Sequence, residues 1–168
     1  PAAAGGVGAP KGPLHGGAGE AVMHTLMEIG EVANVDAFAE KSLAAKRRFM
    51  GMGHRVYKAG DPRAAILRGM AEEACRQSGQ FKWYEMAVKL HERISKAKGL
   101  IPNVDFYSAP LFYSLNIPVD LFTPVIAAGR IAGWAANIIE QHDDNRLIRP
   151  RADYVGAKRR SFVPIDKR

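Results

Sequence analysis

The sequence is organised around one stretch, Gly51-Met52-Gly53-His54-Arg55-Val56-Tyr57-Lys58-Ala59-Gly60-Asp61-Pro62-Arg63. Its glycines allow the backbone to turn tightly and to approach a ligand closely. Asp61 followed by Pro62 predicts a helix start, because the carboxylate caps free N–H groups and proline suits the first helical position. A histidine, several cations and a helix N-terminus favour an anion-binding loop. The alternative is a basic surface turn that only caps a helix.

Helical periodicity surrounds this loop and no strand pattern competes with it, so we predict an all-α fold. Residues 1–13, rich in Ala, Gly and Pro, are either a flexible tail or the end of an element whose first part is absent. Pro110 should interrupt a segment over 104–115. The expected helices follow His15-Gly16-Gly17 up to Gly30, run from the N-cap Asn34 through Leu43, cover 63–78 with Ile66, Met70 and Ala74 on one side, and cover 81–98 and 124–141.

The stretch 124–141 is small and apolar nearly all round, which predicts burial in a bundle or an oligomer interface. Arg130 interrupts it, and a buried guanidinium needs an anion beside it. That anion could be Asp105, Glu140 or a bound carboxylate. No apolar run in the sequence comes near the roughly 20 residues that cross a bilayer, so we expect no membrane partner.

The charge balance predicts an anionic partner. The 168 residues carry a formal net charge of +7, so the anionic partner could be nucleic acid, a phosphate-bearing cofactor or a polycarboxylate. The cations are dispersed, which argues against a nucleic-acid groove.

Cysteine and histidine usage narrows the class further. The single cysteine, Cys75, excludes an internal disulfide framework and fits a reducing compartment, so we expect a cytoplasmic protein and an inert structural thiol. His24, His91 and His142 read as solvated surface residues, and no metal-ligand cluster is present. A chain that begins at Pro1 reads as a piece of something longer.

Five segments in fixed order resemble citrate synthase, over about residues 11–156. The resemblance implies a two-domain, all-α homodimer that condenses an acyl-CoA with oxaloacetate in the tricarboxylic acid cycle. Residues 1–14 would end a large-domain segment, 15–116 would form the small, mobile, CoA-binding domain, and 117–168 would close the large domain. The N-terminal half would be missing. The segments are Gly12-Pro13-Leu14-His15-Gly16-Gly17-Ala18, the 51–63 loop, Pro102-Asn103-Val104-Asp105-Phe106, Gly129-Arg130 and Arg149-Pro150.

The same resemblance implies roles by position. Asp105 would remove a proton from the acyl carbon, His15 would stabilise the resulting enol or enolate, and His54 would polarise the oxaloacetate ketone. Arginine forks bind carboxylates in a defined orientation, and Arg63, Arg130 and Arg149 would do so here, Arg149 in the partner subunit's site. A coenzyme A thioester would be a substrate, and no cofactor would be permanently bound. The residues implied for its binding are Phe49, Gly51, Met52, Gly53, Lys58 and Asn103.

Three positions depart from the family pattern. Ile126 stands where an aromatic residue is usual, Ala109 where glycine is common, and Gly19 where a larger residue is usual. They leave acetyl-CoA and propionyl-CoA open as substrates, so 2-methylcitrate synthesis is the alternative reaction. A non-catalytic CoA-binding module and a basic nucleic-acid binder are alternatives of other classes. The 168-residue chain alone is expected to be inactive or nearly so, because an oxaloacetate-binding histidine of the family and most of the large domain have no counterpart in it.

Overall fold

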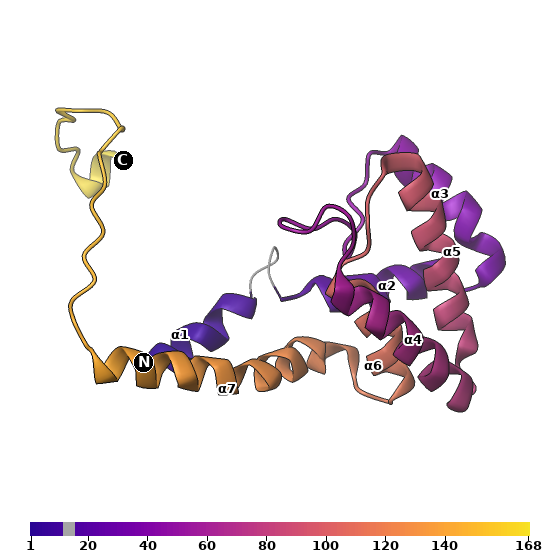
Figure 1. Ribbon diagram of the computed structural model, residues 1–168. Coiled ribbons are helices and arrows are strands. Elements are labelled where there is room, and N and C mark those ends of the chain that lie inside the picture. Colours follow the sequence, from indigo (N-terminus) through magenta and orange to yellow (C-terminus); the bar gives the residue numbers. More distant parts are fainter. Residues whose placement is uncertain (12–15) are drawn as a thin grey trace.

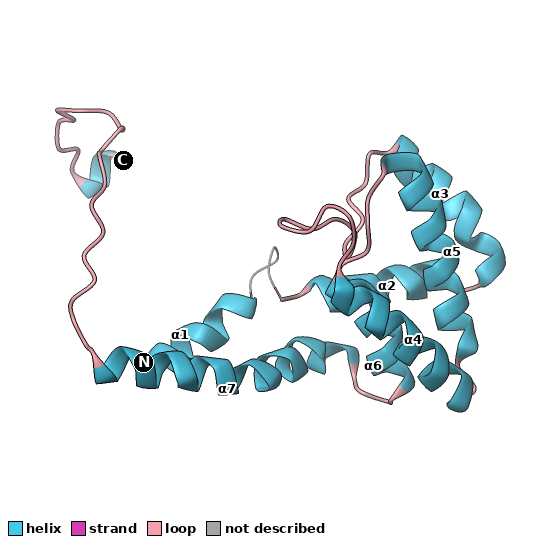
Figure 2. Cartoon of the chain, in the orientation of Figure 1, coloured by secondary structure: helices cyan, strands magenta, loops and turns pink. Residues whose placement is uncertain are grey.

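The computed structural model describes residues 1–11 and 16–168, and every regular element in these ranges is helical (Figures 1 and 2). Their one strand-like feature is an isolated antiparallel bridge between Met52 and Pro102. The all-α prediction is therefore confirmed. The helices are α1 (Ala2–Gly8), α2 (Ala18–Ile29), α3 (Val35–Ala44), α4 (Pro62–Gln77), α5 (Phe81–Lys98), α6 (Val104–Ser114) and α7 (Phe122–Asp143), with short 3₁₀ turns at Ala9–Lys11, Val32–Asn34, Val119–Leu121 and Ile165–Lys167.

Helix α6 packs against α2, α4 and α5 in a globule formed by α2 to α6 (Figure 1). Its side chains from Phe106 to Leu111 are all buried, and the rings of Phe106 and Tyr107 meet edge to face with centroids 5.2 Å apart. The helix continues through Pro110, so the predicted interruption is wrong. Burial on several sides holds the proline in place where its own backbone cannot contribute a hydrogen bond.

Helix α4 buries a different face from the one predicted. Ile66 and Met70 are 65% and 51% exposed, whereas Ala64, Ala71 and Cys75 are buried against α6. Small side chains on this face let the two helices approach closely, and that advantage overrides the size of the apolar residues opposite. Burial also raises the pKa of the Cys75 thiol, as expected for an inert structural cysteine.

Helix ends follow the capping signals with one exception. Asp61 accepts a hydrogen bond from the Arg63 N–H at 3.0 Å at the start of α4, and Asn103 accepts one from the Asp105 N–H at 3.0 Å at the start of α6. Gly99 ends α5 in the left-handed conformation, with φ +64. Asn34 does occupy the N-cap position of α3, but its amide donates backwards to the carbonyl of Ile29, the last residue of α2, and does not cap α3.

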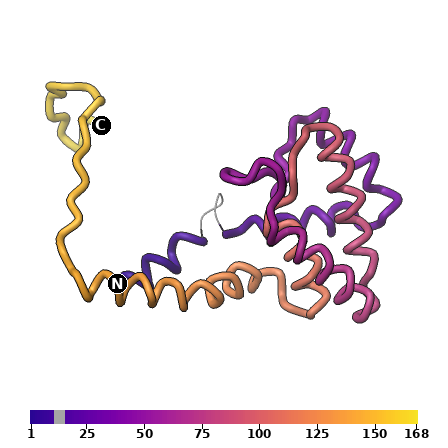
Figure 3. Tube along the Cα trace, in the orientation of Figure 1, coloured from indigo at the N-terminus to yellow at the C-terminus, as the bar shows by residue number. Residues whose placement is uncertain are grey.

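Helix α7 runs out of the globule, with α1 along its side and an extended tail beyond its end (Figures 1 and 3). Trp134 of α7 covers Gly6 of α1, where an added Cβ would lie 3.1 Å from the indole ring. Residues 1–13 therefore begin with a helix rather than a flexible tail. Of α7 only Phe122 is buried, and Ile131 and Ile139 are 48% and 61% exposed. The predicted burial of this helix is not found in this chain by itself.

The segment Val119–Asp143 is long and apolar enough to cross a bilayer, judged on length and hydropathy alone. This corrects the sequence expectation, which counted uninterrupted apolar runs and so broke the segment at its few polar residues. Core helices of water-soluble proteins also meet these criteria, because a helix that is apolar all round is equally suited to a protein interior.

A candidate active site between the glycine loop and three helices

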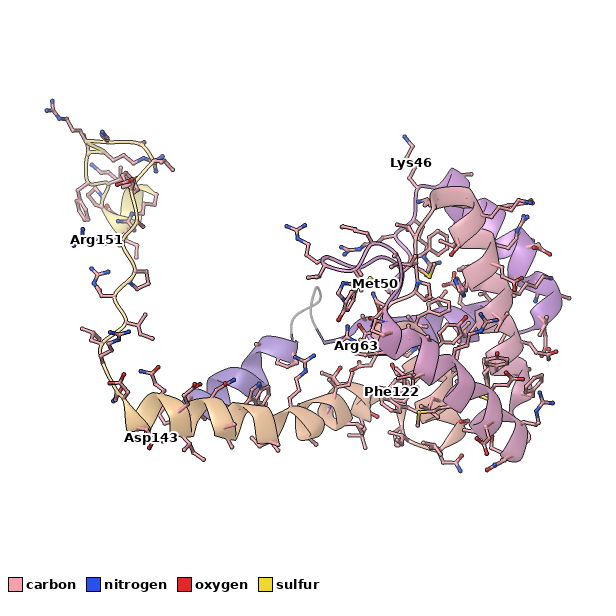
Figure 4. All side chains as sticks on the ribbon, viewed as in Figure 1. Lys46, Met50, Arg63, Phe122, Asp143 and Arg151 are labelled. Carbon is pink, nitrogen blue, oxygen red and sulfur yellow. The ribbon has the colours of Figure 1, made fainter. Side chains whose placement is uncertain are left out.

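An open cleft of about 1050 Å³ lies where the 51–63 loop faces helices α4, α6 and α7. Figure 4 shows Arg63 at the start of α4, on the side of the globule that faces α1 and α7. Phe49, Gly51, Met52, Lys58 and Arg149 do not line the cleft, and His15 lies outside the described residues. The predicted site residues that line it are Gly53, His54, Arg63, Asn103, Asp105 and Arg130.

Three helices each present one face to the cleft. Positions three, four or seven apart lie on the same side of a helix, and the lining residues have that spacing. Each face combines a charged group with an apolar one, so the cleft offers both a polar and an apolar wall. The lining residues of these faces are Arg63 and Leu67 on α4; Asp105, Ser108 and Phe112 on α6; and Ile126 and Arg130 on α7.

The Asp61 carboxylate is buried at the edge of this cleft and carries four hydrogen bonds. It accepts from the backbone N–H, Nε and Nη2 of Arg63 at 3.0, 3.0 and 2.9 Å, and from the Val104 N–H at 3.1 Å. The Arg63 guanidinium holds the pKa of Asp61 below its usual range, and the carboxylate in turn raises the pKa of Arg63. Sequence reasoning identified only the helix cap; the Asp-Pro-Arg spacing was the signal that could have indicated the ion pair.

The hydrogen bonds of His54 assign its tautomer. Its Nδ1 accepts from the N–H groups of Val56 and Tyr57 at 3.0 and 2.9 Å. A neutral imidazole carries one proton, so the proton resides on Nε2. Nε2 lies 3.2 Å from Nη2 of Arg63, which is also a donor. Two donors this close favour a shared oxygen acceptor, which a carbonyl or carboxylate ligand can supply.

The glycine loop is joined directly to the start of α6. Gly53 N–H donates to the Ile101 carbonyl at 2.6 Å, and Asn103 N–H donates to the Gly51 carbonyl at 2.9 Å. The Asn103 amide also donates to the Gly53 carbonyl at 2.9 Å. Gly51 has φ +74 and lies against Val22 and Phe106. Gly51 and Asn103 thus have structural roles, and their implied contacts with coenzyme A stay predictions.

The remaining predicted residues lie around the cleft or far from it. Phe49 is buried beneath Lys98, whose Nζ is 5.6 Å from the ring centroid. Lys58 belongs to the loop, with its Nζ 3.5 Å from the His54 carbonyl. Arg149 lies in the exposed tail, where it donates to the neighbouring Pro150 carbonyl.

Arg130 is exposed, so the premise that it is a buried guanidinium is wrong for this chain. Among the described residues it forms no ion pair with Asp105 or Glu140. Of the three anions considered for it, a bound carboxylate is the one that its position in the cleft still supports.

Some features of this region escaped sequence reasoning. Arg48 and Arg55 also line the cleft and add to its positive charge. His91, predicted to be solvated, is half-buried with Nδ1 2.7 Å from the Tyr107 hydroxyl, and burial lowers its pKa. It faces the ring edges of Phe106 and Tyr107 because α5 packs on α6. His24 and His142 are exposed, as predicted.

Within the described part of the chain, no group of three or more His, Cys, Asp and Glu side chains is arranged to hold a metal ion. The expectation that no metal takes part remains a prediction.

The fold and the cleft together define an all-α protein with an open site where a histidine, a carboxylate and four arginines converge. Residues 1–151 match the family described as citrate synthase, C-terminal domain, and the chain belongs to the citrate synthase family.

Relatives and solved structures agree with this family. The chain is 53% identical over 162 residues to citrate synthase 2 of Bacillus subtilis, covering 96% of this chain and 44% of that protein. It is 46% identical over 165 residues to 2-methylcitrate synthase 1 of Corynebacterium glutamicum, covering 98% and 43%. The ternary complex of citrate synthase from Thermoplasma acidophilum with carboxymethyl coenzyme A and oxaloacetate superimposes with a TM-score of 0.81 at 43% identity, covering 94% and 44%. The chain thus spans less than half the length of these proteins.

Proposed function

We propose that the complete protein containing this chain condenses acetyl-CoA with oxaloacetate to give citrate and free coenzyme A. The observation that carries the proposal is the convergence of His54, Arg63, Asp105 and Arg130 on one cleft. The similar Thermoplasma acidophilum enzyme was solved with a coenzyme A derivative and oxaloacetate, which supports the same two ligand classes here.

In this reaction Asp105 takes a proton from the carbon next to the thioester, and the electron pair moves toward the thioester oxygen. His15 would donate a hydrogen bond to that oxygen, which shares the cost of removing a weakly acidic proton. The enol carbon then attacks the ketone carbon of oxaloacetate. Water finally cleaves the thioester, which releases coenzyme A and gives the third carboxylate of the product.

The oxaloacetate end is served by the two donors that face each other. His54 donates from Nε2 to the ketone oxygen and so favours negative charge there. Arg63 keeps three of the five guanidinium N–H groups after its two side-chain bonds to Asp61, and these can bind a substrate carboxylate. Arg130 binds the second carboxylate from the opposite wall, on α7.

The proposal also includes the parts of the complete enzyme that lie outside this chain. The site is completed by the missing N-terminal half and, in a homodimer, by Arg149 of the partner subunit. Coenzyme A is held along the glycine loop, between a small domain of residues 15–116 and a large domain that includes 117–168. We propose a cytoplasmic enzyme that has no permanently bound cofactor and binds neither nucleic acid nor a membrane.

A second reaction, 2-methylcitrate synthesis from propionyl-CoA, is favoured by one observation. Ile126 lines the same cleft as Asp105, in place of an aromatic residue, and a smaller side chain leaves room for one more methyl group. Relatives of similar identity include 2-methylcitrate synthases. A non-catalytic module or a nucleic-acid binder would not require these four side chains in one cleft.

The test measures thiol release from acetyl-CoA and from propionyl-CoA, with oxaloacetate, by the complete protein. Asp105→Asn should lower turnover by about 10²–10⁴-fold, the usual contribution of a positioned base. Asp36→Asn makes the same chemical change at a surface ion pair with Lys89 and should have no effect. The ratio of the two rates selects citrate or 2-methylcitrate. No turnover from a folded complete protein refutes the proposal, and turnover by the 168-residue chain alone refutes the expectation that it is inactive.

A further inference from the structure

We propose that Asp61 is a positioning residue for this reaction: its carboxylate fixes Arg63, His54 and the start of α6, which carries Asp105, in one arrangement. The inference rests on the proposed function. Asp61 does not line the cleft and would touch neither substrate, so it acts only through the residues that it holds.

Both oxygens of the carboxylate are engaged, and each joins separate parts of the site. Oδ1 accepts from the backbone N–H and Nε of Arg63. Oδ2 accepts from Nη2 of Arg63 and from the N–H of Val104, 43 residues further along the chain. The side chain has no exposed area, so water does not compete for these bonds.

A helix cap alone would not require this arrangement. Capping needs one acceptor oxygen on the Arg63 N–H, which asparagine or serine provides equally well. The second oxygen reaches instead across to α6, one residue before Asp105. The same helix start is also held by Asn103, whose side-chain amide donates to the Gly53 carbonyl. The backbone next to Asp105 is therefore held by two side chains, those of Asp61 and Asn103.

The ion pair also decides what Arg63 can do. A long arginine side chain loses several rotamers when it binds a ligand, and the fork to Asp61 removes that freedom beforehand. Since the pair carries no net charge, Arg63 orients a substrate carboxylate more than it attracts one. Asp61 Oδ2 is also 3.8 Å from Nε2 of His54, beyond hydrogen-bond distance, so the same carboxylate lies beside both donors, the Arg63 guanidinium and His54 Nε2.

The test compares Asp61→Asn with Asp36→Asn in the complete protein. Asparagine keeps the cap but places an NH2 group where Oδ2 accepts, against the N–H of Val104 and Nη2 of Arg63. The measured quantities are kcat, the KM for oxaloacetate, the KM for acetyl-CoA, and the melting temperature. Rates are normalised to the folded fraction. Asp61→Ser, whose hydroxyl can cap but cannot reach Val104, serves as the second variant if Asp61→Asn folds poorly.

We expect kcat/KM for oxaloacetate to fall about tenfold to a hundredfold, the cost of displacing site groups by an ångström or less. The KM for acetyl-CoA should stay within about twofold and Asp36→Asn should match the wild type, since a site-specific displacement leaves other binding unchanged. If Asp61→Asn or the folded Asp61→Ser matches the wild type, the inference is overturned while the function stands. A loss that follows only the unfolded fraction also overturns it. Absence of wild-type turnover overturns the proposed function itself.

Discussion

Substitution of Gly51 by alanine tests why this position carries glycine. Its φ is +74, and an added Cβ would lie 2.6 Å from Cγ2 of Val22 and 3.0 Å from Cα of Phe106. Val22 is 2% exposed and Phe106 1%, so neither has room to withdraw. The substitution therefore adds a backbone cost and a packing cost in one place.

The two costs can be separated with Gly79→Ala. Gly79 has φ +72 and nothing within 4 Å of an added Cβ, so this variant carries the backbone cost alone. A left-handed alanine costs about 1–2 kcal/mol, less a gain of about 0.4–1 kcal/mol from the stiffer unfolded chain. Overpacking at Gly51 adds about 1–3 kcal/mol, so Gly51→Ala should lose about 1–4.5 kcal/mol in total.

The assay is urea unfolding of the wild type and both variants, followed by far-ultraviolet circular dichroism and tryptophan fluorescence. Coincident transitions establish that the globule unfolds as one unit. The reasoning is refuted if the two variants agree within about 0.5 kcal/mol, the usual spread of harmless surface changes. In that case the contacts with Val22 and Phe106 would be soft.

Three further predictions concern the pH dependence of stability, self-association through α7, and the contribution of Arg149 to the partner subunit's site. Burial lowers the pKa of His91, so the free energy of unfolding should fall as the pH drops below about 6.5, where the unfolded chain binds a proton that the buried ring resists. In His91→Gln the denaturation midpoint should depend less on pH over this range. An unchanged pH dependence of the midpoint would contradict the prediction. The exposed apolar face of α7 should make the 168-residue chain self-associate. Ile139→Glu should lower the particle mass measured by light scattering, and a monomeric wild type would argue against the prediction. In the complete protein, the Asp105→Asn homodimer and the Arg149→Gln homodimer should each be impaired. Refolding an equal mixture of the two should restore about one quarter of wild-type turnover, because half of the dimers are then mixed and each mixed dimer has one of its two sites intact. No restoration would place Arg149 in its own subunit's site.

The sequence was most informative where local signals act alone. Helix α5 has the bounds 81–98 that its periodicity and Gly99 predict, and α4 begins at the Asp61-Pro62 pair. Both are decided by residues within one or two turns. The cleft residues came from ordered motifs whose members lie far apart in the chain, which periodicity could not have joined.

What failed depends on neighbours that a single sequence does not reveal. Ile66 and Met70 have the right spacing for a buried face, yet α6 packs against the alanines opposite. His91 has charged neighbours along the chain but aromatic ones in space. The second oxygen of Asp61 accepts from Val104, which follows it in the chain beyond both α4 and α5.

The pairing of Gly53 with Ile101 and of Asn103 with Gly53 closes a loop of about 50 residues that contains α4 and α5. Loop closure of this length carries an entropic cost that only native packing offsets. The histidine and the base should therefore come together late in folding, and no short peptide around either would reproduce the site. Once these hydrogen bonds have formed, the backbone N–H groups of Gly53 and Asn103 should exchange with deuterium only when the whole globule opens. The site would then persist for as long as the globule stays folded and disappear with it in one step.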